Sequence, residues 1–173
     1  MNSGFLLVRL ILGGYLAAHG AQKLFGWFGG YGLGGTGGWL ESLGFRPGRF
    51  FALAAGLCEG VGGLLVILGF LSPLGPGLIV IAMVVAMGAV HWKNGFFVAA
   101  NGVEMPLAWA TCSVAMAFAG PGRYSLDALL GLLVFRPWLV RGTIALAVVI
   151  ALVNLWLRRS PAAAQGGSPA QGA

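Results

Sequence analysis

Glu59 is the residue of this sequence with the most evident chemical potential, because it lies in the middle of a long apolar stretch. Its neighbours on both sides are apolar for roughly ten residues. An ionisable group at the centre of a membrane helix costs about 2.5 to 3.5 kcal/mol, so it is expected to face the bundle interior and to find a partner. Gly56, Gly60 and Gly63 form a stripe of small residues about 60° away on the same helix. We therefore expect Glu59 to point toward another helix.

His19 and Lys23 are the expected partners of Glu59. Together with Arg9 they lie within roughly 80° of one helical face at about 100° per residue. His19 and Lys23 are one turn apart and can act on the same ligand, whereas Arg9 lies about 21 Å from Lys23 along the axis. Two interpretations stay open: an ion-pair network that fixes helix register, and a pocket whose imidazole, ammonium and carboxylate groups bind a ligand and exchange protons.

A lipid bilayer is the solvent in which these groups must be positioned. Of the 173 residues, 58% are apolar and 8% are charged, and the mean hydropathy is +0.90, outside the range of ordinary soluble domains. Crossing the hydrocarbon core takes roughly 20 mostly apolar residues, and residues 5–24, 48–71, 73–92 and 105–119 meet or approach that length. Residues 142–157 are shorter but uncharged. The prediction is an all-α, polytopic transmembrane four-helix bundle with an additional C-terminal hydrophobic helix.

The segments between these stretches are expected to be less regular. Residues 26–38 are predicted to form a glycine-rich loop, and 39–45 one or two amphipathic turns. Ser72 is expected to cap the third helix and Ser125 the segment 126–140, which is expected at the membrane interface. Residues 160–173 hold Ser, Pro, Ala, Gln and Gly alone, so a disordered tail is predicted.

Alternating helices place most of the candidate residues at one membrane face. That face is expected to hold His19, Lys23, Arg49, His91, Lys93 and Glu104, and the other face Arg9, Arg123 and Asp127. Because the first face also carries more Lys and Arg, the positive-inside rule predicts that it is cytoplasmic.

Several function classes are excluded by what the chain contains. The ten Lys and Arg against four Asp and Glu are scattered singly, which argues against nucleic-acid binding and favours contact with anionic lipid. Cys58 and Cys112 stand apart in apolar stretches and form no dithiol pair. The histidines and carboxylates lack metal-ligand spacing, so no metal site is predicted, and no phosphate loop, serine triad or haem-attachment motif occurs.

Four stretches of sequence form a recognisable ordered set. They are LVRLILGGYLAAHGAQKLFGWFGG, CEGVGGLLVILGFLSPLG, MGAVHWKNGFF followed by NGVEMPL, and GPGRYSLD. Together they resemble the DoxX family over residues 5–130. The resemblance implies a four-helix membrane protein related to the membrane subunit of thiosulfate:quinone oxidoreductases and to subunits of membrane redox-defence complexes. By position, the family pattern falls on Arg9, His19, Lys23, Glu59, His91, Glu104 and Asp127. It also implies a core of 1–130, an extra membrane or interfacial helix within 131–159 and a tail of 160–173.

The leading hypothesis is a multi-pass cell-membrane subunit that binds a quinone and exchanges electrons with a partner oxidoreductase. The expected roles are catalytic for Glu59 and His19, substrate-binding for Lys23, His91 and Glu104, structural for Arg9 and Asp127, and ring-stacking for Trp27 and Trp92. No covalently bound cofactor is expected, and assembly as a homo-oligomer is left open. The alternatives are a proton or small-solute transporter or channel, in which Glu59 and His19 line a polar path, and a membrane scaffold with no site of its own.

Overall fold

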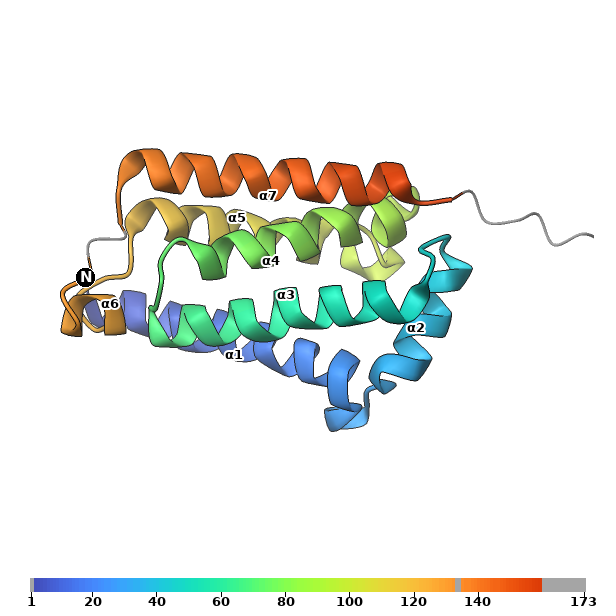
Figure 1. Cartoon of the computed structure of the whole chain (residues 1–173), viewed down its shortest axis with the longest axis horizontal. Coiled ribbons are helices and arrows are strands. Elements are labelled where there is room, and N and C mark those ends of the chain that lie inside the picture. Colours follow the sequence, from blue (N-terminus) through green and yellow to red (C-terminus); the bar gives the residue numbers. More distant parts are fainter. Residues whose placement is uncertain (1, 133–134, 160–173) are drawn as a thin grey trace, which may run out of the picture.

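The computed structural model describes residues 2–132 and 135–159 and is all-α in that part of the chain. Figure 1 shows the long helices lying side by side along one axis. The helices are α1 (Asn2–Phe25), α2 (Gly32–Ser42), α3 (Gly48–Leu68), α4 (Leu74–Ala86), α5 (Glu104–Ala119), α6 (Leu126–Leu129) and α7 (Pro137–Leu157). After α4 the same rod continues through a π turn, Met87–His91, and a 3-10 turn, Trp92–Asn94.

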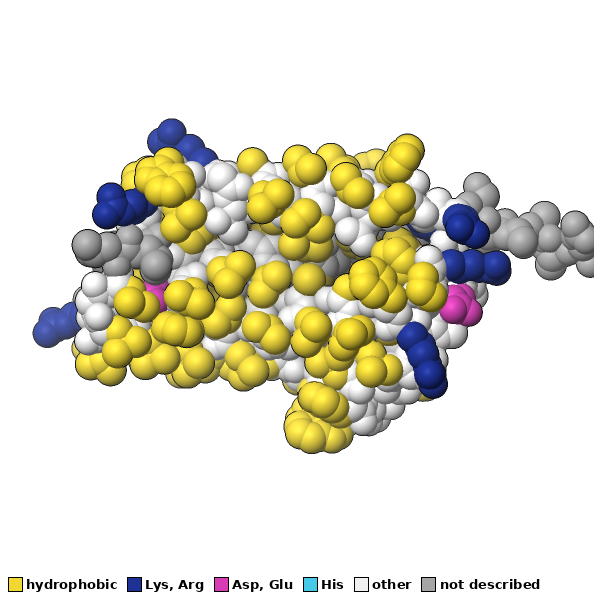
Figure 2. Space-filling model, viewed as in Figure 1, with side chains coloured by type: hydrophobic (Ala, Val, Ile, Leu, Met, Phe, Trp, Pro, Cys, Tyr) yellow, Lys and Arg dark blue, Asp and Glu magenta, His cyan; other side chains and the backbone are white. Residues whose placement is uncertain are grey.

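In the part of the chain that the structure describes, four helices are long and apolar enough to cross a membrane: Ser3–Phe25, Gly48–Leu68, Leu74–Asn94 and Pro137–Leu157. Helix α5 has 16 residues and is about 24 Å long at 1.5 Å per residue. Figure 2 shows apolar side chains covering the middle of the visible face and basic side chains at its two ends. The predicted polytopic helical bundle with an additional C-terminal helix is confirmed.

Helices α1 and α3 pack backbone against backbone through their glycines. A methyl group on Gly20 would lie 2.3 Å from the Gly60 nitrogen, and one on Gly13 would lie 2.6 Å from the Gly63 oxygen. Real Cβ contacts are never that short, so these positions require glycine. Small residues at a membrane helix interface allow such an approach, which gains van der Waals contact. The predicted stripe of small residues on α3 therefore faces Gly13 and Gly20 of α1.

The segment predicted as a glycine-rich loop is instead largely helical. Helix α2 covers Gly32–Ser42 and packs on the start of α3, where Gly37 approaches so closely that a Cβ on Gly48 would lie 2.1 Å from the Gly37 oxygen. The Glu41 carboxylate also accepts the Gly48 N–H at 2.9 Å. The prediction was wrong because the packing of Thr36, Gly37 and Leu40, all buried, overrides the weak helix propensity of glycine.

The structure differs from prediction in the segment 126–140 and at Ser72. Residues 126–140 do not form one interfacial segment: α6 ends at Leu129 and α7 begins at Pro137, so the fifth helix has 21 residues. Ser125 caps α6 as predicted, accepting the Ala128 N–H at 3.1 Å. Ser72 does not cap α4, whose N-cap is Pro73. The predicted tail, 160–173, lies outside the described residues.

The ends of the helices confirm which residues share a face. Helix α7 runs parallel to α4, and its C-terminus meets the α2–α3 turn: Arg158 donates to the Leu43 oxygen, and the Arg159 N–H donates to the Gly44 oxygen at 3.0 Å. Both arginines therefore lie at the end of the bundle that holds Lys23, as expected if the fifth helix crosses the membrane (Figure 1).

Candidate functional site

A cavity of about 290 Å³, here called the central cavity, lies between α1, α3, α4 and α5 near the end of the bundle that α2 covers. Its ionisable lining residues are His19, Lys23, Glu59 and His91, four of the residues predicted from the sequence. The rest of its lining is largely apolar and includes Trp109. A mostly apolar cavity with a few converging polar groups is the usual form of a small-molecule site.

The ion pair between Lys23 and Glu59 joins α1 to α3 at the wall of the central cavity. The Lys23 Nζ contacts the Glu59 Oε2. Of the two partners expected for Glu59, His19 and Lys23, it is therefore Lys23 that forms the ion pair. The Glu59 side chain is 7% exposed and that of Lys23 is 23% exposed. The carboxylate is therefore held inside the bundle, whereas the ammonium group keeps access to the cavity. The glycine contacts between α1 and α3 bring the two backbones close enough for this pair to form.

His19 lies in a cluster of three rings rather than in the ion pair. Its imidazole centroid is 5.4 Å from the Tyr15 ring and 5.4 Å from the Trp109 ring, and the Tyr15 and Trp109 rings are 5.1 Å apart. Tyr15 and His19 are one turn apart on α1, and Trp109 reaches them from α5. Edge-on and tilted ring contacts of this kind hold side chains in a defined orientation. The imidazole is thus fixed at the cavity wall.

His91 has a defined proton position. Its Nδ1 lies 2.8 Å from the Asn101 carbonyl oxygen, and a carbonyl can only accept, so Nδ1 carries the proton. In the neutral ring, Nε2 is then a hydrogen-bond acceptor and a base. The π turn Met87–His91 places this ring on the cavity lining, and π turns occur frequently at functional sites.

A second cavity, here called the vestibule, adjoins the central cavity at the C-terminal end of α1. It has a volume of about 570 Å³. Lys23, Thr36 and Trp39 line both cavities. The remaining vestibule lining is contributed by Gln22, Gly29, Gly30, Tyr31 and Gly35. Because Gly29, Gly30 and Tyr31 belong to the turn between α1 and α2, the vestibule connects the polar groups with the outside of the bundle.

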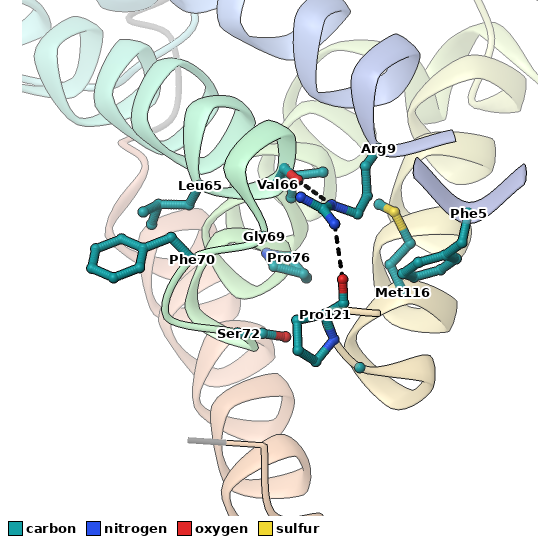
Figure 3. Close-up of a pocket in the computed structure, with 11 residues that line it drawn as sticks. Phe5, Arg9, Leu65, Val66, Gly69, Phe70, Ser72, Pro76, Met116 and Pro121 are labelled. Carbon is teal, nitrogen blue, oxygen red and sulfur yellow. Dashed lines mark hydrogen bonds between the residues drawn. The ribbon is translucent and has the colours of Figure 1, made fainter. Parts of the chain in front are cut away.

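Arg9 belongs to a different cluster at the opposite end of the bundle (Figure 3). It is 3% exposed, and its guanidinium donates to four backbone carbonyls at 2.7 to 2.9 Å: those of Val66, Ile67, Pro121 and Tyr124. The first two are carbonyls of the last turn of α3, where the intrahelical hydrogen bonds run out. Arg9 therefore joins α1, the end of α3 and the turn after α5.

Asp127 completes this structural cluster from α6. Its carboxylate accepts the N–H groups of Leu71 at 2.8 Å and Ser72 at 2.9 Å, and it is 2% exposed. The α3–α4 turn is thereby attached to the segment that follows α5. The geometry is compatible with the structural roles predicted for Arg9 and Asp127, and it separates both from the central cavity.

Glu104 does not line the central cavity, although its neighbours Met105 and Pro106 do. Its carboxylate accepts the Val98 N–H at 2.7 Å and so shapes the loop before α5. The stacking partners expected from the sequence, Trp27 and Trp92, are 59% and 75% exposed and lie outside the cavity lining.

Trp109 and Trp39 line the cavity instead, and sequence reasoning missed both. Trp109 left no sequence signal, because nothing in the spacing along the chain shows that α5 approaches α1. Trp39 follows residues 26–38, for which the sequence predicts a loop. Within residues 2–132 and 135–159, no group of three or more His, Cys, Asp or Glu side chains is arranged to hold a metal ion.

Comparison with known proteins finds one family and no individual relative. No curated protein and no solved structure matches the chain. The family model for DoxX matches residues 4–92, just over half of the chain. The matched part runs from α1 to the π turn after α4 and contains His19, Lys23, Glu59 and His91. The chain is therefore an integral membrane protein that belongs to the DoxX family.

Proposed function

We propose that this protein is the membrane subunit of a redox system and binds a quinone in the central cavity. The observation that carries the proposal is the convergence of His19, Lys23, Glu59 and His91 on one largely apolar cavity inside the bundle. Its volume, about 290 Å³, lies at the lower end of the roughly 300 to 1,000 Å³ typical of small-molecule sites, which suits a flat ring system of one or two rings.

A quinone needs what this cavity offers. Its ring is apolar and stacks on aromatic side chains, and Trp109 and Trp39 supply such surfaces. Its two carbonyl oxygens accept hydrogen bonds, which the Lys23 ammonium and the N–H of the His19 imidazole can donate. The supporting argument is thus one of matching chemistry: hydrocarbon walls for the ring and fixed donors for its oxygens.

Reduction of a quinone to a hydroquinone consumes two electrons and two protons. A partner oxidoreductase supplies or removes the electrons in this proposal. The protons exchange through groups that can carry them. In the reverse direction, when a hydroquinone is oxidised, the unprotonated Nε2 of His91 accepts one hydroxyl proton and the Glu59 carboxylate accepts the other. The vestibule beside Lys23 gives these groups a route to water.

The transport alternative receives less support from the geometry. Toward the Arg9 end, the interior is filled by the hydrophobic side chains of Leu12, Leu16, Val66, Ile79 and Met116. Polar groups line a cavity at one end of the bundle, and this apolar layer separates them from the Arg9 cluster. A through path for a proton or solute would require this layer to rearrange.

Saturable binding of a soluble short-chain quinone tests the proposal. Purified wild-type protein is compared with His19→Ala, Lys23→Met and Glu59→Gln, and we expect each variant to bind at least about tenfold more weakly, equivalent to about 1.4 kcal/mol. Lys93→Met is the matched control, because Lys93 is an exposed cation at the same end of the bundle and does not line the cavity. Folding is checked by tryptophan fluorescence.

Equal affinity in all three folded variants would overturn the quinone site. Uptake of protons or solute by proteoliposomes that lack bound quinone would then favour the transporter. Absence of both activities would favour the scaffold.

A further inference from the structure

The central cavity adjoins a second, narrower space that opens toward the lipid. This apolar slot has a volume of about 140 Å³ and lies between α3, α4 and α7. Its own lining comes from Phe51, Ala54 and Cys58 of α3, Ile81 of α4, and Ile150 and Asn154 of α7. Apart from Cys58 and Asn154 this lining is hydrocarbon, and the Asn154 amide donates to the Ile150 carbonyl at 2.8 Å within its own helix. The slot thus suits an apolar occupant.

The slot and the central cavity share a wall. Ala55 of α3 and Ala82 of α4 line both, together with Leu40, Phe45 and Val85. The two alanines leave little side-chain volume between the helices at this crossing, and the shared wall contains no charged or hydrogen-bonding side chain. An aliphatic chain attached to a ring in the cavity therefore meets hydrocarbon surfaces along its way into the slot.

The slot also lies at the depth of the hydrocarbon core. Ala54 and Cys58 are about 9 and 15 Å along α3 from its start at Gly48, at 1.5 Å per residue. Ile150, on the opposite wall, is 37% exposed, so the slot reaches the surface that faces lipid. Figure 1 shows α4 flanked by α3 and α7 where the slot lies.

We propose that the ligand of this protein is a lipid-borne quinone with an aliphatic tail, and that the tail leaves the central cavity through the apolar slot. This inference rests on the proposed quinone site and adds the class of its ligand and its route of entry from the bilayer. The slot, about 140 Å³ in volume, accommodates the first methylenes of such a tail. The remainder of the tail extends between α3 and α7 into the lipid.

The test compares two ligands that share a ring, one without a tail and one with a decyl chain. Both are titrated into protein in nanodiscs of one lipid composition, so that partitioning into the lipid cancels when a variant is compared with wild type. Ala54 lines the slot and not the central cavity, so in Ala54→Phe the new ring fills the slot, and the decyl ligand should bind at least about tenfold more weakly. The tailless ligand should bind within about twofold of wild type.

Two further variants make the result interpretable. Asn154→Phe fills the slot from α7 and should give the same selective loss, which keeps the test valid if Ala54→Phe does not fold. Leu57→Phe is the matched control, since Leu57 is exposed on another side of α3, and it should leave both affinities unchanged.

The outcomes separate the two proposals. Failure of wild-type protein to bind the tailless ligand would overturn the quinone site, and the tail route with it. If wild-type protein binds the tailless ligand, but the slot variants weaken the two ligands equally or weaken neither, the tail route alone is overturned.

Discussion

The ion pair between Lys23 and Glu59 leads to a specific prediction, because its two side chains are buried to different extents. The perturbation is the removal of each charge, alone and together, in Lys23→Met, Glu59→Leu and the double variant. Removing one partner of a buried pair costs about 3 to 5 kcal/mol, because the other charge is left uncompensated. Replacing both partners by apolar side chains is often neutral, since neither charge then needs to be desolvated.

The two single variants should not be equivalent. In Lys23→Met, the carboxylate of Glu59 remains in a site where its side chain is 7% exposed. Protonating a glutamate of ordinary acidity at pH 7 costs about 3.7 kcal/mol, so we expect a loss of about 3 to 4 kcal/mol. In Glu59→Leu, the remaining ammonium of Lys23 is 23% exposed and lines the vestibule. Water can reach it, and the loss should be about 1 to 3 kcal/mol.

The assay is a double-mutant cycle on the free energy of unfolding. Purified protein in detergent micelles is unfolded by denaturant and followed by tryptophan fluorescence, with Lys93→Met as the control for loss of an exposed cation. We expect the double variant to lie within about 1 kcal/mol of wild type, which, with the single losses above, gives a coupling energy of about 3 to 8 kcal/mol between the two positions. A coupling energy below about 0.5 kcal/mol, or a larger loss in Glu59→Leu than in Lys23→Met, would refute this reasoning.

Three other predictions follow from packing, hydrogen bonding and charge. Gly20→Ala should destabilise the bundle by about 2 kcal/mol or more, because the new methyl group meets the backbone of α3. Gly14 has open space around it, so Gly14→Ala should stabilise α1 by up to about 1 kcal/mol. Thermal unfolding measures both changes. Arg9→Lys should lose about 2 to 4 kcal/mol, because an ammonium group cannot reach all four carbonyls that the guanidinium satisfies, and an unchanged unfolding midpoint would contradict that role. In a cysteine-free background, Ser42→Cys should resist an impermeant maleimide in intact cells while Arg123→Cys is labelled, since the basic residues favour a cytoplasmic Lys23 end; the reverse pattern would invert the topology.

Much of the candidate site could be predicted because a charge inside a bilayer is costly. Glu59 could not face lipid, and His19 and Lys23 lay on a polar face of the neighbouring helix, so a pairing of Glu59 with one of them followed from energetics. The structure decides that the partner is Lys23. His91 could be assigned to the same end because consecutive helices alternate in direction. Glu104 met the same topological criterion, yet its carboxylate binds the loop before α5. Topology assigns a residue to an end of the bundle, whereas local hydrogen bonding decides where its side chain points.

By itself the sequence determined the number and approximate bounds of the long helices, since hydrocarbon requires runs of apolar residues that satisfy their own backbone hydrogen bonds. It also determined that the glycine stripe of α3 must face a close neighbour. Only the tertiary structure decided that Trp109 packs on His19, that the glycine-rich segment folds as α2, and that Asp127 reaches back to the α3–α4 turn. These contacts join residues far apart in the chain, and their geometry depends on how several helices pack at once. No spacing within one segment encodes that arrangement.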